Sequence, residues 1–449
     1  MDPIHTTWAT SDRWVPKTFV RPFVRFSRIE ASSGVVLLVA AAAALVWANS
    51  GAADSYFGLL EEKVTIEFLG FHLSETLHAF INDGLMAIFF FVVGLEIKRE
   101  LVLGDLRDPK AAALPVMAAL GGMIFPALIY LAFNASTGGE VVRGWGIPMA
   151  TDIAFAVGVV ALLGSRVPSG AKLFLLALAI ADDIGAIAVI AIFYTTDLNA
   201  RFLGAAVGGL LVVWIASKVN IRALWFYVPM ALVIWYFTLE SGVHATLAGV
   251  ALGFLTPARP YYSPDEFDRR ARTILNQYTI DGDEQRAQER SDYEALLLAE
   301  IATESVSPLS RMEHQLAAWS SFVVVPIFAL ANAGVSFRGV NLVESVTSRV
   351  ALGVALGLIV GKLVGISTFT LAAVKLGMGR LPQGTGWPQV VGLAAVAGVG
   401  FTVSLFVAEL AFTHPGITDL AKVGIFSGSL VAGIIGSLVL ARARPPSQL

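Results

Sequence analysis

The sequence predicts an all-α polytopic membrane protein of about twelve transmembrane helices, and three observations lead to this fold class. Of the 449 residues, 56% are hydrophobic and only 14% are charged, and the mean hydropathy is +0.72, whereas a soluble domain carries about 25% charged residues. Apolar windows of about 20 residues, enough to cross a bilayer as a helix, recur along the chain. The lysines and arginines fall mainly in alternate connecting segments.

The apolar windows set the order of the helices. The first, at Val35–Trp47, is expected to stay in the mature protein, because the Arg-rich stretch before it is long for a signal peptide. The seventh and eighth, Ala223–Phe237 and Gly242–Leu255, are short, and Glu240 to Gly242 favours a turn between them. The twelve spans are centred near Ala40, Phe89, Met123, Ala154, Asp183, Leu210, Met230, Ala248, Pro326, Lys362, Gly400 and Ile434.

The charges of the loops predict the orientation. If the N-terminus is cytoplasmic, 24 of the 31 lysines and arginines lie inside, six lie outside, and Lys362 lies in mid-membrane. The long loop counts little under the positive-inside rule, yet 17 against six remain without it. We therefore expect both termini in the cytoplasm.

The domain organisation follows from the same pattern. We expect a cytoplasmic segment at residues 1–32, helices one to eight at 33–255, a charged cytoplasmic insertion at 256–312, helices nine to twelve at 313–441 and a tail at 442–449. The insertion, which includes Asp281-Gly282-Asp283-Glu284, is expected to be partly helical, with a regulatory or partner-binding role as the alternative. Without cysteine, thiol chemistry and disulfides are excluded, and nothing suggests nucleic acid.

Four charged residues fall inside predicted helices. Asp182 and Asp183 interrupt the uncharged stretch Leu173–Tyr194, Asp152 lies in helix four, and Lys362 lies at the centre of helix ten. A charge at membrane depth costs several kcal/mol and marks an ion pathway or a site. A salt bridge that only fixes helix packing is the alternative, but it needs one acid for one base, and here acids exceed bases three to one.

Helices four and eleven carry clusters of small residues. Gly144, Gly146 and Pro148 precede Thr151-Asp152, and Gly398 to Thr402 lie in the middle of helix eleven. Small residues also serve close helix packing. Paired interruptions in two halves, however, point to discontinuous helices that cross around a mid-membrane ion site. Helices three to five and ten to twelve run in opposite directions, as an inverted-topology repeat requires.

The residue types indicate which ion binds. Na⁺ and Li⁺ prefer oxygen ligands, such as carboxylates, the Thr151 hydroxyl and carbonyls of unwound backbone. Protons compete for the same oxygens, so a site that faces one side at a time exchanges the two ions. Lys362, away from water, is expected to release a proton when the carboxylates are recharged. No cofactor and no enzyme activity are expected, only Na⁺ or Li⁺ and protons as transported ions.

Two other classes of protein fit the sequence less well. A sodium-coupled solute symporter of related architecture would place polar side chains around an organic substrate, and few are present in the predicted core. An intramembrane aspartyl protease would carry its aspartates in Tyr-Asp and Gly-x-Gly-Asp contexts, and neither occurs here.

Seven motifs closely resemble those of the NhaA-type sodium/proton antiporters, and the resemblance runs from about Gly34 to Leu440. The motifs are Ala150-Thr151-Asp152-Ile153-Ala154-Phe155-Ala156, Ala179-Ile180-Ala181-Asp182-Asp183-Ile184-Gly185-Ala186, Gly361-Lys362-Leu363-Val364-Gly365-Ile366, Asn82-Asp83-Gly84-Leu85-Met86, Gly94-Leu95-Glu96-Ile97-Lys98-Arg99-Glu100, Gly242-Val243-His244-Ala245-Thr246 and Ala331-Asn332-Ala333-Gly334-Val335.

The resemblance implies roles for the mid-membrane residues. Asp152 and Asp183 would be the exchanging carboxylates that ligate the cation, and Thr151 would neighbour them at the unwound crossing. Asp182 would pair with Lys362 in one protonation state. The family's usual exchange is electrogenic, with two protons entering for one Na⁺ or Li⁺ leaving the cytoplasm, in the bacterial cytoplasmic membrane. Some members form homodimers.

The resemblance also implies a pH-sensing cluster at the cytoplasmic mouth, although a charge cluster at a helix end is ordinarily a solvated face. Ser310 and Ala317 depart from the family's pattern, and the insertion lies just before the cluster. His244 is either a further sensor or a structural residue, and Glu409 is expected to extend towards the membrane interface. The cluster itself comprises Glu96, Arg99, Glu100, Glu313 and His314.

Overall fold

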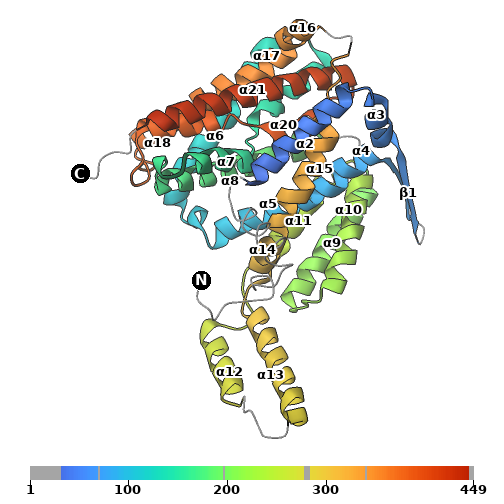
Figure 1. Ribbon diagram of the computed structural model, residues 1–449, viewed down its shortest axis with the longest axis vertical. Helices are drawn as coiled ribbons and strands as arrows, with labels where there is room; N and C mark the ends of the chain where they lie inside the picture. Colours follow the sequence, from blue (N-terminus) through green and yellow to red (C-terminus); the bar gives the residue numbers. More distant parts are fainter. Residues whose placement is uncertain (1–31, 69–70, 196–197, 278–283, 339–340, 444–449) are drawn as a thin grey trace.

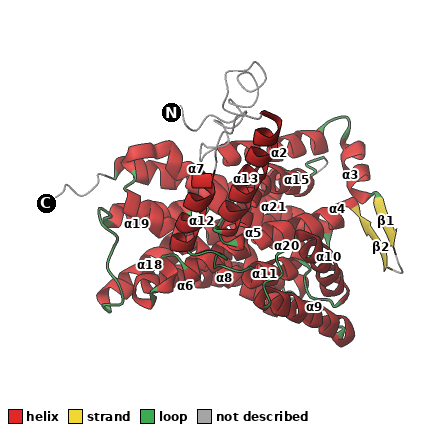
Figure 2. Cartoon of the chain, turned by 90° about the horizontal axis from the view of Figure 1, so that it is seen from below, coloured by secondary structure: helices red, strands yellow, loops and turns green. Residues whose placement is uncertain are grey.

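A computed structural model describes residues 32–68, 71–195, 198–277, 284–338 and 341–443. In these ranges the chain is almost entirely helical, which confirms the predicted all-α membrane fold (Figures 1 and 2). Nine described helical segments are long and apolar enough to cross a membrane, one bent pair makes a tenth, and two shorter apolar helices accompany them. All twelve predicted centres lie in these segments. The N-terminal segment 1–31 and the end of the tail, 444–449, lie outside the described residues.

Five of the nine segments are uninterrupted helices, and the other four join several elements. The uninterrupted ones are α2 (Ser32–Asn49), α6 (Pro109–Asn134), α8 (Ser169–Phe193), α9 (Ala200–Lys218) and α21 (Pro415–Arg442). The composite segments consist of α4 (Leu77–Phe80), η4 (Ile81–Leu85) and α5 (Met86–Val102); η6 (Gly139–Met149), α7 (Ile153–Leu163) and η7 (Gly164–Arg166); α14 (Pro308–Trp319), η8 (Ser320–Val324) and α15 (Val325–Asn332); and α17 (Arg349–Leu356), η9 (Gly357–Gly361) and α18 (Lys362–Lys375).

The bent pair is α19 (Trp387–Val396) and α20 (Phe401–Ala411), whose axes differ by 46°. The two shorter apolar helices are α10 (Leu224–Glu240) and α11 (Thr246–Leu255). The turn predicted between them is present, because α10 ends at Glu240 and Gly242 has a φ of 79°, a conformation that glycine adopts readily.

A small antiparallel hairpin was not anticipated from the sequence. Strands β1 (Lys63–Phe68) and β2 (Phe71–Thr76) pair from Lys63↔Thr76 to Phe68↔Phe71. The hairpin follows the short helix α3 (Ala53–Glu61) and extends from one edge of the helical body (Figure 2). Six-residue strands are much shorter than the windows that reveal membrane spans, so the hydropathy pattern did not show them.

The charged insertion forms two helices, α12 (Pro264–Gln277) and α13 (Glu284–Glu304), which extend away from the helical body (Figure 1). Asp281, Gly282 and Asp283 lie outside the described residues. Two further short elements, η5 (Asp105–Arg107) and α16 (Leu342–Thr347), connect longer helices.

Glycines allow α6 and α18 to pack backbone against backbone. A Cβ atom added at Gly365 would lie 2.7 Å from the carbonyl carbon of Gly121, and one at Gly361 would lie 2.7 Å from the Cα of Pro126. Such distances are closer than any side chain tolerates, so glycine is required at this crossing. The close contact places Lys362, the first residue of α18, in the interior of the protein.

We expect Gly365→Ala to lower the free energy of unfolding by about 1–3 kcal/mol, because the added methyl group overpacks this helix pair. Thermal unfolding of the purified protein in detergent measures the effect. Gly204→Ala is the matched control, since Gly204 is on α9 with no atom within 4 Å of its added Cβ. Equal melting temperatures for the two variants would contradict the prediction.

Candidate functional site

The two predicted helix interruptions are present and contact each other. The chain is unwound at 150–152, before α7, and at 397–400, between α19 and α20. The Asp152 N–H donates to the carbonyl of Val399 at 2.7 Å, and the Thr151 hydroxyl donates to the carbonyl of Ala397 at 2.9 Å. Each interruption therefore satisfies backbone groups that the other leaves without a helical partner.

Asp152 caps two helices with one carboxylate. Its Oδ1 accepts the Phe155 N–H at 3.0 Å, which caps α7. Its Oδ2 accepts the N–H of Thr402 at 3.1 Å and the Thr402 hydroxyl at 2.5 Å, at the start of α20. A negative charge is favourable at a helix N-terminus. The buried Asp152 therefore stabilises two N-termini that meet in the interior.

Lys362 and Asp182 form a buried ion pair, as the resemblance implies for one protonation state. Lys362 Nζ lies 2.6 Å from Asp182 Oδ2, and the two side chains are 1% and 2% exposed. Nζ also donates to the Thr151 hydroxyl at 2.9 Å. Among the described residues, Asp182 Oδ1 has no hydrogen-bond partner. One carboxylate oxygen therefore holds the lysine and the other is unoccupied.

Asp183 has the least engaged carboxylate of the three. It is 7% exposed, more than Asp152 or Asp182 at 2%. No donor within the described ranges is recorded as bonded to it, whereas the charges of Asp182, Asp152 and Lys362 act on it. Direct hydrogen bonds therefore join Lys362 to Asp182 and to Thr151 beside Asp152, whereas Asp183 is linked to them through charge alone. Among the described residues, no three acids or histidines lie close enough together to hold a metal ion.

Sequence reasoning missed two features that build this site. The first is η9, a π-helix that ends at Gly361, directly before Lys362. A Cβ at Gly357 would lie 2.7 Å from Pro148, so the widened turn packs against helix four. The second is the Thr402 hydroxyl. Gly357 and Gly361 are four residues apart, and this spacing was a visible signal of close packing. Nothing in the sequence, however, links Thr402 to Asp152.

The expected pH-sensing residues on α5 and α14 are close together. Arg99 forms ion pairs with Glu313 and, at 3.3 Å, with Glu100. Glu96, one turn earlier on α5, is half-buried, and its charge interacts with Glu313 and with Asp183. Direct contacts therefore join Arg99 to Glu313 and Glu100, and Glu96 is coupled to Glu313 and to Asp183 through its charge alone. His314 is exposed beside Glu313.

His244 lies apart from that cluster. It sits in the turn before α11, whereas Lys98 of α5 contacts the C-terminal end of α11. Its Nε2 is 2.7 Å from the carbonyl of Tyr194, and burial lowers the pKa of the His244 imidazole. A neutral ring that donates to a backbone carbonyl fits the structural alternative.

Glu409, which was expected to extend towards the membrane interface, has a partner within the protein. It forms an ion pair with Lys422 at 2.8 Å, between α20 and α21, and its side chain is 17% exposed. Lys422 lies on the next helix, and the hydropathy pattern alone does not reveal this partner.

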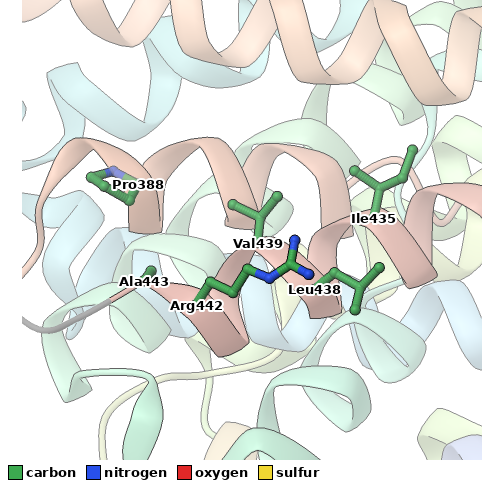
Figure 3. A pocket seen from close by; sticks show the side chains of 6 residues that line it. All are labelled: Pro388, Ile435, Leu438, Val439, Arg442 and Ala443. Carbon is green, nitrogen blue, oxygen red and sulfur yellow. The ribbon is translucent and has the colours of Figure 1, made fainter.

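The pocket in Figure 3 lies where α19 begins and α21 ends. Apolar side chains and Arg442 line it, and none of the charged or hydroxyl-bearing residues of the crossing belongs to it; its lining residues are Pro388, Ile435, Leu438, Val439, Arg442 and Ala443. It therefore contributes nothing to the site.

Comparison with known proteins gives one consistent result. The family model described as Na⁺/H⁺ antiporter 1 matches residues 24–440. A protein of Oleidesulfovibrio alaskensis named Na(+)/H(+) antiporter NhaA is 45% identical over 95% of this chain and 96% of its own length. Proteins of the same name from Koribacter versatilis and Rhodopirellula baltica are 44% and 45% identical over 95% of this chain, and over 92% and 93% of theirs.

The double cap predicts a specific loss of stability. Thr402→Val removes the hydroxyl that donates to Asp152 while keeping the shape of the side chain, so we expect about 1.5–3 kcal/mol of destabilisation, typical of a hydrogen bond to a charged group. Thermal unfolding in detergent measures it. Thr402→Ser, which keeps the hydroxyl, should retain most of the stability, and equal losses in both variants would refute the cap.

His244 predicts a pH dependence of stability. Because its pKa is lowered in the folded state, the unfolded state binds the proton first, and stability falls as the pH drops below about 6.5, the ordinary value. We expect this loss to be smaller in His244→Gln, whose amide can still donate to Tyr194. Melting temperatures from pH 8 to 5 test it, and identical profiles would argue against a buried neutral ring.

Proposed function

The chain belongs to the NhaA family of sodium/proton antiporters, and from this premise we propose that it exports Na⁺ or Li⁺ in exchange for protons by alternating access. The observation that carries the proposal is the buried, incompletely satisfied set of carboxylates beside Lys362. A salt bridge that only fixes helix packing usually has both acid oxygens hydrogen-bonded. Family membership also favours antiport over the sodium-coupled symporter.

The hydrogen bonds support a division of roles among the carboxylates. Asp183 and the unoccupied oxygen of Asp182 are the oxygens most available to a cation. Asp152 accepts three hydrogen bonds, which leave only one of its four lone-pair sites, on Oδ1, for a cation. We therefore propose Asp183 as the principal cation ligand, with Asp182 and Asp152 completing the site, and Thr151 as a bridge between Lys362 and the crossing.

Charge balance then gives the exchange. When a cation binds at Asp183 and Asp182, Lys362 loses its partner and releases a proton, and Asp183 releases its own. When the site faces the other side, two protons displace the cation and the Lys362–Asp182 pair forms again. Two protons for one cation is an electrogenic exchange, driven by the proton gradient.

We further propose that the pH-sensing cluster of Glu96, Arg99, Glu100, Glu313 and His314 regulates exchange. Arg99 joins α5 to α14 through Glu313, and the charge of Glu96 acts on both Glu313 and Asp183. A change of protonation in this cluster therefore alters the electrostatic potential at the site. His314 would respond from the exposed side.

The remaining proposals concern placement and assembly. We place the chain in a bacterial cytoplasmic membrane with both termini inside, residues 33–255 and 313–441 in the membrane, and 1–32, 256–312 and 442–449 in the cytoplasm. A homodimer is supported by the β1–β2 hairpin, because both strands of a two-stranded sheet keep an edge open for pairing with a second copy.

Na⁺-triggered proton movement in everted vesicles between pH 6 and 9 tests the function. We expect Asp183→Asn to abolish exchange, a loss of at least about 100-fold, because the cation loses its charged ligand. Lys362→Ala should strongly reduce it.

Glu409→Gln is the matched control, since it removes a partly buried carboxylate outside the crossing, and it should exchange as the wild type does. A wild type that gives no Na⁺ or Li⁺ response at any pH would overturn the proposal. So would undiminished exchange in Asp183→Asn.

A further inference from the structure

The α12–α13 hairpin leaves the helical body and returns to it at one point. The Tyr261 N–H donates to the carbonyl of Glu304 at 2.9 Å, and the Leu309 N–H donates to the carbonyl of Pro257 at 3.1 Å. These two hydrogen bonds join the chain entering the hairpin to the chain leaving it. We call this paired segment, residues 257–261 and 304–309, the stem. Beyond it, α12 and α13 extend away from the other helices (Figure 1).

Two adjacent cations of α5 bind the chain just before and just after the stem. Lys98 Nζ donates to the carbonyls of Phe254, at 2.7 Å, and Thr256, where α11 ends and the stem begins. Arg99, the next residue, forms its ion pair with Glu313, one turn after the stem enters α14. The stem is therefore attached to the same turn of α5 that carries the proposed sensing cluster.

A third attachment ties the stem to the turn between α9 and α10. Arg222 Nη1 lies 2.6 Å from Glu304 Oε2, with side chains 19% and 25% exposed. The Arg222 guanidinium also lies over the Tyr261 ring, 5.1 Å from its centre. Arg222 thus contacts both chains of the stem and keeps them beside the helix ends.

We propose that the α12–α13 hairpin is a control arm, whose stem holds the Arg99–Glu313 contact together and so sets the pH at which exchange begins. The proposal rests on the antiport function proposed above and assigns a regulator to that site. The arm joins the ends of α5, α9, α10, α11 and α14. Opening the site towards the arm's side requires the α5 and α14 ends to separate, and the stem resists that separation.

The neighbouring elements carry several other charged groups, and all are kept in the variants below. They are Glu96, Lys98 and Glu100 on α5, Arg107 on η5, Arg311 and His314 on α14, Lys218 on α9, and Lys172, Asp182 and Asp183 on α8. Since the arm touches none of the buried carboxylates in the described contacts, its removal changes the resistance to opening and leaves the cation ligands in place.

Three variants of the full chain test the arm in everted vesicles. In the first, residues 264–300 are replaced by a short Gly-Ser linker, which the closed stem allows. The second is Glu304→Gln, and the third combines Arg222→Glu with Glu304→Arg to restore the pair in reverse. Asp268→Asn is the matched control, because it breaks the exposed Asp268–Arg272 pair within α12, away from the stem.

We expect Glu304→Gln to lower the pH of half-maximal exchange by about half a unit, about threefold in proton concentration, as for loss of a partly buried ion pair. The linker variant keeps the stem and its Arg222–Glu304 pair, so it should shift the half-maximal pH in the same direction but by less. The maximal rate should stay unchanged, the reversed pair should return towards the wild-type value, and Asp268→Asn should match the wild type.

An unchanged or raised half-maximal pH in Glu304→Gln would overturn the control arm, even if the linker variant fails to fold. A wild type without any Na⁺-dependent proton flux would instead overturn the antiport function. The two failures are therefore distinguishable.

Discussion

The structure depends on one constraint: two helices are broken side by side in an apolar interior, and their exposed backbone groups have no water to bind. Asp152 supplies most of the hydrogen bonds that these backbone groups need. Its carboxylate caps α7 and α20, and its N–H binds the carbonyl of Val399. Thr151 links the same crossing to Lys362. The charged residues are therefore parts of the fold as well as of the site.

Much of the fold could be predicted because membrane helices are specified by composition over long windows. All twelve centres and both interruptions followed from apolar length and from glycine and proline positions. The strands β1 and β2 and the π-helix η9 did not, because each of these elements is only five or six residues long. Thr402 was missed for another reason, since it meets Asp152 across 250 positions of sequence. Tertiary contacts of that kind leave no local pattern.

The site separates a carboxylate that is fixed from one that is available. Asp152 is held by three hydrogen bonds, and Asp182 is held by Lys362 through one oxygen. Asp183 alone keeps both oxygens uncommitted within the part of the chain described. The acid that maintains the helix crossing, Asp152, is therefore a different residue from the acid whose oxygens are available, Asp183.

The closed stem of the insertion has a consequence for how such chains change over time. Hydrogen bonds at Tyr261–Glu304 and Pro257–Leu309 fix the spacing of the two ends whatever lies between them. Extra length beyond a closed base adds little loop entropy, because that cost grows only with the logarithm of length. At this position a module can therefore be inserted, enlarged or removed during evolution without repacking the membrane helices. A fluorescent reporter can be inserted there for the same reason.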